Sequence, residues 1–342
     1  MHTLPDLNQL RRILVIQKQA LGDVVLTTPV FTLLRKALPG ASLHFLTNVP
    51  FAPLLEALEA VDRVWAYPYP ASSLLGVFAF ARRLRRQRYD LVIDYQGTTV
   101  PALLSFLSGA RWRLGWGNVA RRWAYNLFSQ ANRSEDYVAI QKCRALQAVG
   151  IEGLETQIQV SFSPEDLQRA RTFLRSHTGG RERPVINLSV KSKRQARQWM
   201  PDRFARLNDL LAGRLNALVC FNVGPGEQDY VAQVARLCRR PPVILPRWPL
   251  TTFAAFLSLC RLHISHDNGV KHLAVAVGTP TISLFGPTNP RLWQAPGNAR
   301  HLAVVGKAPC HPCDHRRCGW LVCLADIEVE AVLSLARNVL SR

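Results

Sequence analysis

A stretch near the carboxyl end of the chain gathers side chains that could bind a charged ligand. It reads DNGVKHLAVAVGTPTISLFGPTNP and runs from Asp267 to Pro290. Asp267 ends an apolar strand pattern, and Asn268, Gly269 and His272 open an apolar helix pattern. A helix N-terminus attracts phosphate, whereas an ionised aspartate only accepts hydrogen bonds. A sugar nucleotide, which carries both phosphate and hydroxyl groups, would suit this stretch, although His272 alone also fits a packed core histidine.

A second acid follows the first strand pattern of the chain, in QKQALGDVV. Gly22 and Asp23 open the next helix there. Asp23 fits two roles. Its carboxylate could cap the free N–H groups of that helix. It could also act as a general base toward an acceptor hydroxyl, an effect worth about 10²–10⁴-fold in rate.

A basic loop follows the first strand pattern of the second half, in SVKSKRQARQWMPDRF from Ser189 onward. Lys191, Lys193, Arg194 and Arg197 stand in this loop. Several cations at the carboxyl end of a strand can neutralise a diphosphate. A solvated basic loop is the other interpretation.

A third loop, NVGPGEQDY, has a tight Gly-Pro-Gly turn before Glu227 at a helix start. It lacks the Gly-Lys-Ser/Thr of a phosphate-binding P-loop. Glu227 could accept hydrogen bonds from ribose hydroxyls, as acids do in dinucleotide-binding folds. Helix capping explains this residue equally well.

Alternating strand and helix patterns place these loops. In the first half we expect strands at 11–18, 42–48, 63–68 and 89–97, and helices at 22–38, 101–109 and 137–150. In the second half we expect strands at 184–190, 217–223, 242–246, 262–267 and 279–287. Apolar strands separated by helices are typical of parallel sheets covered on both faces. Polar sequence around 151–163 separates the two blocks, so we predict two Rossmann-like domains, 1–160 and 161–342, facing across a cleft.

The net positive charge of the chain indicates polyanionic binding partners. Lys+Arg number 43 and Asp+Glu 23, a net charge of +20. Nucleic acid is disfavoured because the aromatic residues do not interleave with the basic clusters. Phosphorylated substrates and an anionic membrane surface remain, as does a general solubility bias. No apolar run approaches the ~18–20 residues that span a bilayer, and no signal peptide is evident, so we expect a cytoplasmic protein.

Some arginines are organised on one predicted helix, in GVFAFARRLRRQRYD. Val77, Ala81 and Leu84 form its apolar stripe, and Arg82, Arg83 and Arg86 fall on the opposite side. These arginines form either a solvated helix face or a docking surface for a phosphorylated or membrane-bound acceptor.

Four of the eight cysteines are clustered in CHPCDHRRCGWLVC. Cys310, Cys313, Cys318 and Cys323 could supply tetrahedral thiolate ligands to a structural zinc or iron, with His311 and His315 as spare donors. Reduced cysteines in a loop are the alternative, and disulfides are disfavoured in the cytoplasm.

Taken together, the motifs resemble glycosyltransferase family 9, the heptosyltransferases of the lipopolysaccharide inner core. The resemblance is carried by ILVIQKQALGDVVLTTPVFTLLRKALPGASLHFLTN, YDLVIDYQG, RLGW, RQWMPDRF, GPGEQD and SHDNGVKHLAVAVGTPTISLFGPTNPRLW, which cover most of the chain. It implies a GT-B fold with an N-terminal acceptor domain and a C-terminal donor domain. It also implies inverting transfer of heptose from an ADP-sugar to a phosphorylated lipid-linked oligosaccharide (lipopolysaccharide core and lipid A), without an obligatory metal.

The resemblance also implies roles for individual residues. Asp23 matches the proposed catalytic base, Arg197 the cation that holds the donor diphosphate, and Glu227 the ribose contact. The donor sugar and phosphates fall to Asp267, Asn268, Gly269 and His272, with help from Ser189 and Lys193. We expect the acceptor to contact Lys18, Arg82, Arg83 and Arg86.

Two positions depart from the family pattern. The family usually has a basic residue six positions before the aspartate, where this chain has Gln17, and Lys18 points to the other face of the strand. Arg197 replaces a lysine and offers a planar fork that can bind two oxygens. From the sequence we predict an ADP-heptose-dependent transferase that is a monomer and is peripheral to the cytoplasmic face of the inner membrane. A GT-B transferase with another nucleotide sugar, or a non-catalytic sugar-nucleotide or lipid-binding protein of this fold, remains open.

Overall fold

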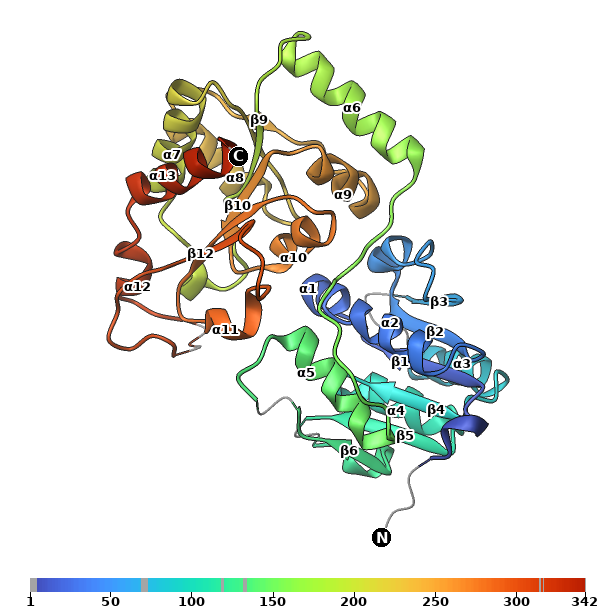
Figure 1. The fold of residues 1–342 in the computed structure, drawn as a ribbon. Helices are drawn as coiled ribbons and strands as arrows, with labels where there is room; N and C mark the ends of the chain where they lie inside the picture. The colour runs from blue at the N-terminus through green and yellow to red at the C-terminus, as the bar shows by residue number, and fades with distance from the viewer. Residues whose placement is uncertain are drawn as a thin grey trace. The chain divides into compact units, whose positions relative to one another are not determined.

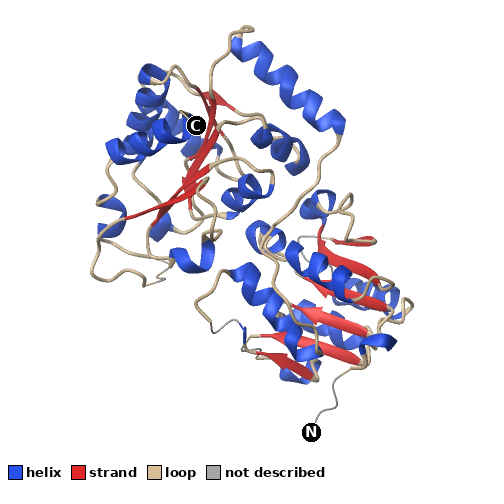
Figure 2. Cartoon of the chain, viewed as in Figure 1, coloured by secondary structure: helices blue, strands red, loops and turns tan. Residues whose placement is uncertain are grey.

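The computed structural model describes residues 5–68, 73–117, 120–131, 134–313, 315 and 317–341. The chain divides into two compact units, Met1–Ser161 and Phe162–Arg342, called here the N-terminal and C-terminal units. Each is built from parallel strands with helices on both faces (Figures 1 and 2). In the described residues, no helix is long and apolar enough to cross a bilayer.

The sheet of the N-terminal unit has the strand order β3-β2-β1-β4-β5-β6. Its strands are β1 Arg12–Ile16, β2 Ser42–Asn48, β3 Arg63–Tyr67, β4 Leu91–Asp94, β5 Trp112–Trp116 and β6 Leu127–Ser129. Its helices are α1 Leu21–Val25, α2 Thr28–Ala37, α3 Leu74–Arg85, α4 Thr99–Leu107 and α5 Val138–Arg144, with short 3-10 turns η1 Leu7–Gln9, η2 Val49–Leu54, η3 Arg122–Ala124 and η5 Ala145–Val149.

Two helical layers cover this first sheet (Figure 1). α3 and α4 pack together on one face, where Val77, Phe80 and Leu84 meet the strands in a common core. α2 and α5 pack together on the other, where Phe31 stacks on Phe45 at 4.8 Å. Because both faces are covered, the central strands are apolar throughout rather than alternating.

The sheet of the C-terminal unit has the order β12-β11-β10-β7-β8-β9. Its strands are β7 Val185–Ser189, β8 Leu218–Phe221, β9 Val243–Ile244, β10 Leu262–His266, β11 Thr281–Phe285 and β12 His301–Val305. Its helices are α6 Pro164–Thr178, α7 Pro201–Arg214, α8 Gln228–Leu237, α9 Leu250–Ser258, α10 Gly269–Ala276, α11 Pro290–Trp293, α12 Val322–Ala325 and α13 Val329–Leu340, with the 3-10 turn η6 Gln195–Arg197. Counted from the first strand of each unit, both sheets follow the same order, 3-2-1-4-5-6, which is the Rossmann arrangement.

Most predicted strands are confirmed, and the differences have local causes. The predicted helix 22–38 is wrong as a single element: it is α1 followed by α2, because Pro29 in the first turn of α2 cannot donate to the preceding turn. The Thr28 hydroxyl instead donates to the carbonyl of Val25 at 2.8 Å. β5, β6 and β12 were not predicted, because their residues mix arginine, glycine and tryptophan with few β-branched apolar ones or form an edge.

Candidate functional site

The carboxyl edge of the second sheet brings two predicted residues together. Ser189 ends β7, and Asp267 follows the neighbouring strand β10. The next residue, Asn268, caps α10: its side-chain oxygen accepts the N–H of Lys271 at 3.1 Å, and its amide lies 3.4 Å from the Ser189 hydroxyl. This edge is where the strand order reverses, the usual ligand-binding position of open parallel sheets.

Asp267 lies at the centre of a buried charge cluster and is only 3% exposed. One carboxylate oxygen accepts a hydrogen bond from the Lys271 ammonium at 2.7 Å. The other accepts the Thr288 hydroxyl at 2.9 Å and pairs with Arg197 at 3.2 Å. Burial alone would raise the pKa of Asp267, but the charges of Lys271 and Arg197 outweigh it and hold that pKa below its ordinary value.

The same cluster fixes the basic loop after β7. Arg197 ends η6, and its guanidinium also donates to the carbonyl of Asp267 at 3.3 Å. Lys271 is fully buried and also donates to the carbonyl of Trp293 at 2.9 Å. The predicted Arg197 and Asp267 therefore meet, while the roles of Lys271 and Thr288 were missed. The spacing of Asp267 and Lys271, four residues apart, is a readable signal for this ion pair.

The other predicted donor residues surround this cluster at different depths. Gly269 is the first residue of α10, and His272 is buried, with its ring 6.2 Å from that of Trp293. Lys193 is exposed. Its charge and that of Lys191 act on Glu227, but burial has the larger effect and raises the pKa of Glu227.

Glu227 does not cap α8 with its side chain. Its carboxylate accepts the N–H of Gly224 at 2.9 Å and so closes the Gly-Pro-Gly turn. A side chain at 224 would put its Cβ 2.6 Å from this carboxylate, so the carboxylate would have to move from its present position.

In the N-terminal unit, Asp23 lies in the first turn of α1 and is half-buried. One of its carboxylate oxygens lies 3.4 Å from the N–H of Ala20. Its backbone carbonyl accepts two hydrogen bonds, from the hydroxyl of Thr27 at 2.7 Å and from the ammonium of Lys142 at 2.9 Å.

Lys142, on α5, was missed by the sequence analysis. It is fully buried and also donates to the Gln17 side-chain oxygen at 3.0 Å and to the Thr27 hydroxyl at 2.7 Å. Burial lowers its pKa to about 8, while the charge of Asp23 opposes that shift. A buried cation therefore stands beside Gln17, the position where the family pattern has a basic residue.

The neighbouring Lys18 faces the other way, as strand alternation requires. Its ammonium lies 4.0 Å above the ring of Tyr67. Burial lowers the pKa of Lys18, partly offset by the charge of Asp94. Asp94, another missed acid, is fully buried at the end of β4 and accepts the Tyr125 hydroxyl at 2.6 Å.

The predicted amphipathic helix is α3. Val77, Ala81 and Leu84 are buried, and Arg82, Arg83 and Arg86 are exposed, as predicted. In the described residues, no ion pair joins these arginines to Asp23.

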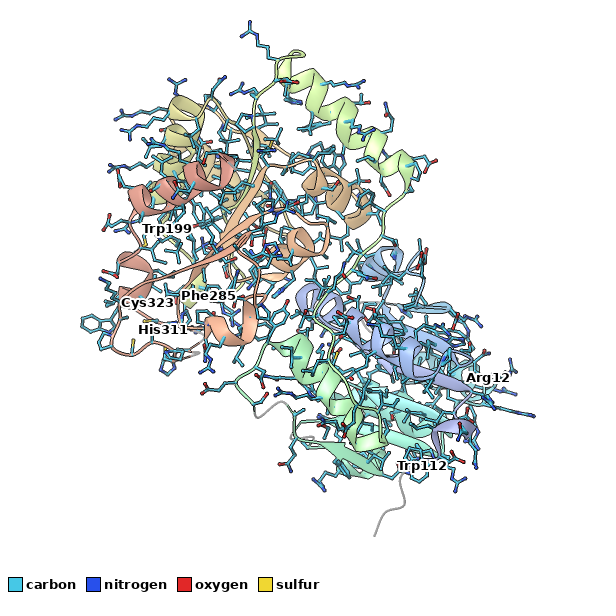
Figure 3. All side chains as sticks on the ribbon, viewed as in Figure 1. Arg12, Trp112, Trp199, Phe285, His311 and Cys323 are labelled. Carbon is cyan, nitrogen blue, oxygen red and sulfur yellow. The ribbon has the colours of Figure 1, made fainter. Side chains whose placement is uncertain are left out.

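The predicted metal centre is not formed: in the described residues, no three His, Cys, Asp or Glu side chains are placed to hold a metal ion. All four cysteines of the cluster are free thiols, although the other three lie close enough to Cys323 to act on it electrostatically. The segment is held instead by its backbone and by His311, which is labelled with Cys323 in Figure 3. The N–H of Cys313 donates to Pro287, that of Cys318 to the Gln195 side chain, and the His311 ring to the carbonyl of Thr288.

A close backbone contact fixes the start of this segment. Gly306 follows β12, and a Cβ added there would lie 1.7 Å from the carbonyl oxygen of Cys323. The cysteine segment thus braces the loops that carry Gln195 and Thr288, and does so without a metal-ligand geometry.

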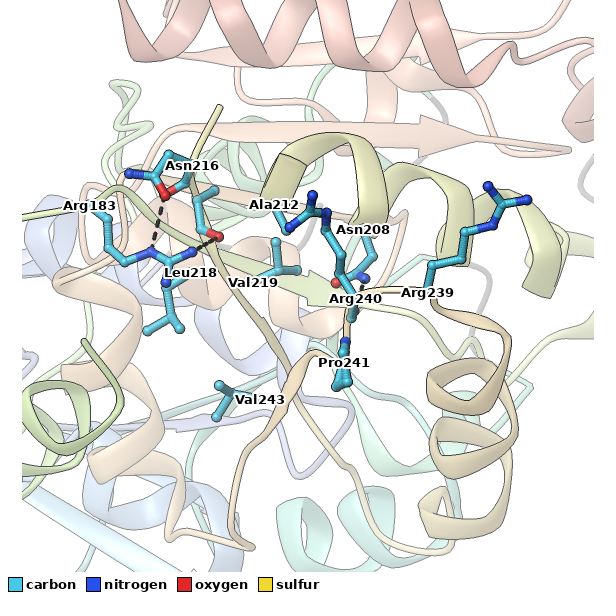
Figure 4. Close-up of a pocket in the computed structure, with 11 residues that line it drawn as sticks. Arg183, Asn208, Ala212, Asn216, Leu218, Val219, Arg239, Arg240, Pro241 and Val243 are labelled. Atoms are coloured by element: carbon cyan, nitrogen blue, oxygen red, sulfur yellow. Dashed lines mark hydrogen bonds between the residues drawn. The ribbon is translucent and has the colours of Figure 1, made fainter. Parts of the chain in front are cut away.

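A hollow of about 540 Å³ lies elsewhere in the C-terminal unit (Figure 4). Arg183, Ala217 and Pro241, which line it, precede β7, β8 and β9, so it lies at the amino edge of the sheet, opposite Asp267. The Arg183 guanidinium donates to the carbonyls of Asn216 at 3.1 Å and Ala217 at 2.7 Å. The Arg183 guanidinium therefore binds backbone carbonyls of its own unit. The hollow is separate from the candidate site.

Known proteins share both the sequence pattern and the fold. The family model for glycosyltransferase family 9 (heptosyltransferase) matches residues 77–321. A lipopolysaccharide heptosyltransferase 3 of Escherichia coli is 26% identical over 284 residues, covering 80% of this chain and 83% of that protein. A family 9 glycosyltransferase of Veillonella parvula has a TM-score of 0.84 at 23% identity, covering 97% of each chain. The E. coli heptosyltransferase WaaC with ADP has a TM-score of 0.73 at 21% identity, covering 96% of this chain and 99% of WaaC.

The predicted GT-B fold with two Rossmann-like domains is confirmed by these structures and by the two sheets described above. The match to the family model spans most of the chain. The chain belongs to glycosyltransferase family 9, the heptosyltransferases, and is a glycosyltransferase enzyme.

Proposed function

We propose that this chain is an inverting heptosyltransferase that moves heptose from ADP-heptose to the inner core of lipopolysaccharide. Support comes from the family, from relatives named as lipopolysaccharide heptosyltransferases, and from a related structure that carries ADP. Within the chain, the observation that carries the proposal is the buried cluster of Asp267 with Lys271 and Arg197. This cluster holds the planar guanidinium of Arg197 in place at the carboxyl edge of the second sheet, where ligands of such sheets bind.

In this proposal the C-terminal unit binds the donor. Arg197 grips the diphosphate, helped by Lys193, Ser189 and the N–H groups at Gly269. Asp267 acts through Arg197 rather than on the ligand, because its carboxylate already accepts hydrogen bonds from Lys271 and Thr288 and pairs with Arg197. Fixed cations aimed at charge that grows on a leaving group are worth more in a dry site than in water.

Glu227, Asn268 and His272 complete the donor site in the same proposal. Glu227 contacts the ribose, since its carboxylate lies in the turn that follows β8. Asn268 and His272 lie at the start of α10 and contact the heptose and phosphates. No metal is required, because the cations of the chain neutralise the diphosphate.

The N-terminal unit binds the acceptor and supplies the base. Asp23 takes the proton from an acceptor hydroxyl while the oxygen of that hydroxyl forms a bond to the anomeric carbon of the heptose. The bond from that carbon to the diphosphate breaks on the opposite side, and ADP leaves with the electron pair. The phosphorylated acceptor, at the cytoplasmic face of the membrane, contacts Lys18 and the arginines Arg82, Arg83 and Arg86.

Lys142 is a positioning residue for Asp23. Its ammonium holds the backbone carbonyl of Asp23 and the Gln17 side chain together, so the first turn of α1 is fixed to α5. The basic residue that the family pattern has in β1 is thus replaced by a cation from another helix.

A donor panel tests the reaction. The protein is incubated with ADP-heptose and other nucleotide sugars and with core-lipid acceptors, and products are read by mass spectrometry. We expect transfer from ADP-heptose, with inversion at the anomeric carbon and no loss of turnover in EDTA. Transfer from another nucleotide sugar alone would replace the donor assignment.

Asp23→Asn tests the base. Turnover should fall by about 10²–10⁴-fold while ADP-heptose binding is kept. Asp202→Asn is the matched control, because Asp202 also lies in the first turn of a helix but is exposed. Unchanged turnover in Asp23→Asn would exclude this residue as the base.

A further inference from the structure

Exposed apolar side chains gather on one helical layer of the N-terminal unit. On α3, Leu74 is 72% exposed, Leu75 81% and Phe78 54%. On the adjoining α4 and η3, Phe106 is 48% and Trp123 53% exposed. A soluble surface normally carries such side chains singly, so a group of five needs a reason.

These side chains lie on elements that pack side by side. α3 packs against α4, and α4 packs against η3. The rings of Phe106 and Trp123 meet edge to face with centroids 5.6 Å apart. The opposite side of α3 is already used, because Val77 and Phe80 are buried against the sheet. The exposed side of this layer is called here the α3–α4 face, and in the described residues of the N-terminal unit no element covers it.

Positive charge borders the apolar residues along α3. Leu75, Phe78, Arg82 and Arg86 recur at spacings of three and four residues, which puts them on one side of the helix. The amino half of that side is therefore apolar and the carboxyl half basic. In the described residues, none of Arg82, Arg83, Arg85 or Arg86 forms an ion pair. Their charge is left available for an anionic partner.

We propose that the α3–α4 face docks on an anionic lipid bilayer. The leucines and Phe78 enter the acyl region, while the α3 arginines remain at the level of the lipid phosphates. Trp123 lies at the interface, where its amphipathic ring is favoured. The bilayer suits this face better than a protein, because the face combines flexible aliphatic side chains with arginines that form no ion pair in the described part of the chain. The described residues of α3, α4 and η3 also include no acid for a cationic or mixed-charge partner.

This inference deepens the proposed function, since the acceptor of a lipopolysaccharide heptosyltransferase is a membrane lipid, but its test needs no acceptor. The full chain is sedimented with vesicles of phosphatidylcholine alone or with phosphatidylglycerol added. We expect binding to the anionic vesicles, weakened by salt, and little binding to phosphatidylcholine alone. Vesicle binding is read without turnover, so it can succeed or fail independently of heptose transfer.

Two paired variants locate the contact. Leu75→Ser/Phe78→Ser and Arg82→Ala/Arg86→Ala should each weaken binding to anionic vesicles at least tenfold, because each arginine near an anionic surface contributes about 1 kcal/mol and buried apolar area a similar amount. Matched controls change exposed residues of the other unit. They are Leu237→Ser, 51% exposed at the end of α8, and Arg171→Ala/Arg175→Ala on α6. Circular dichroism verifies that every variant is folded.

The results of these experiments distinguish a lipid bilayer from a second copy of the chain as the partner of the α3–α4 face. Absence of vesicle binding, equal binding to neutral vesicles, or unchanged binding in both paired variants would each overturn the proposal. So would a dimer that Leu75→Ser/Phe78→Ser converts to monomer while vesicle binding stays intact, since the occupant would then be a second copy of the chain. With a detergent-dispersed acceptor, Leu75→Ser/Phe78→Ser should keep wild-type turnover.

Discussion

The two units place a buried aspartate at the same point of the same topology, yet surround it differently. Asp94 ends β4 and Asp267 follows β10, each the fourth strand of its unit. Asp94 is held by neutral donors: the Tyr125 hydroxyl and the N–H groups of Gln96 and Gly97. Asp267 is held by two cations.

The charge states of the two acids differ accordingly. Burial raises the pKa of Asp94 to about 6, because the hydrogen bonds from neutral groups and the weaker effect of the Lys18 charge only partly offset the loss of water. The pKa of Asp267 lies below its ordinary value, because Lys271 and Arg197 stabilise the anion. Topology therefore fixes where a polar group stands, and the neighbouring side chains fix its charge.

The largest effect is expected for Asp267→Asn. It leaves the buried ammonium of Lys271 without its carboxylate partner, which should lower the free energy of unfolding by about 3–5 kcal/mol at pH 7. Denaturant unfolding measures this, with Asp94→Asn as the matched variant. Asp94→Asn should not destabilise at that pH, because the carboxylate there has no ion pair to lose. Equal losses in both variants would contradict the contrast between the two acids.

Lys142→Met should remove a pH dependence of stability. The pKa of Lys142 is about 8 in the folded chain against 10.5 ordinarily, so between these values the unfolded chain binds more protons. Wild-type stability should therefore rise from pH 8 to 10 by roughly 3 kcal/mol relative to Lys142→Met. Parallel pH curves would show that this ammonium is not buried as described. If Lys142 positions Asp23 through its backbone carbonyl, kcat should fall, whereas the KM for the donor should not change.

Asp94→Asn should act in the acid range. The folded chain keeps a proton on Asp94 up to about pH 6, the unfolded chain only to about 3.8, so the folded chain binds more protons between these values. Wild-type stability should fall as pH rises through this window, by up to roughly 3 kcal/mol, and this fall should be absent in Asp94→Asn. Urea unfolding at pH 4, 5 and 6 gives the comparison, and identical trends would reject it.

The smallest effect concerns a surface ion pair of the same C-terminal unit. Arg206 pairs with Glu330, but both side chains are exposed. Glu330→Gln should change stability by less than about 1 kcal/mol, because water screens the pair. A loss as large as that of Asp267→Asn would mean that burial does not explain the strength of the Asp267 cluster.

Sequence alone predicted the two α/β units and the loops at the carboxyl edges, because apolar runs and helix signals are local. It placed Arg197 and Asp267 in one site through the family resemblance. It missed Lys142, because a lysine within a helix pattern normally predicts an exposed residue. Asp94 was read only as part of a strand, since its burial depends on Tyr125, a residue 31 positions away.

The predicted metal site in the cysteine segment was wrong for a related reason. Spacing shows which thiols could share a metal, but backbone hydrogen bonds to Pro287 and Gln195 decide where they lie. Those partners are distant in sequence and gave no local pattern.

The close contact between Gly306 and the backbone of Cys323 limits which residue types position 306 can accept. In a saturation library selected for activity, position 306 should return glycine alone, because even a methyl group would overlap the carbonyl of residue 323. The next residue, Lys307, has an exposed side chain and contributes through its backbone N–H to Asp326. Adjacent codons should therefore show opposite tolerance, one invariant and the other permissive.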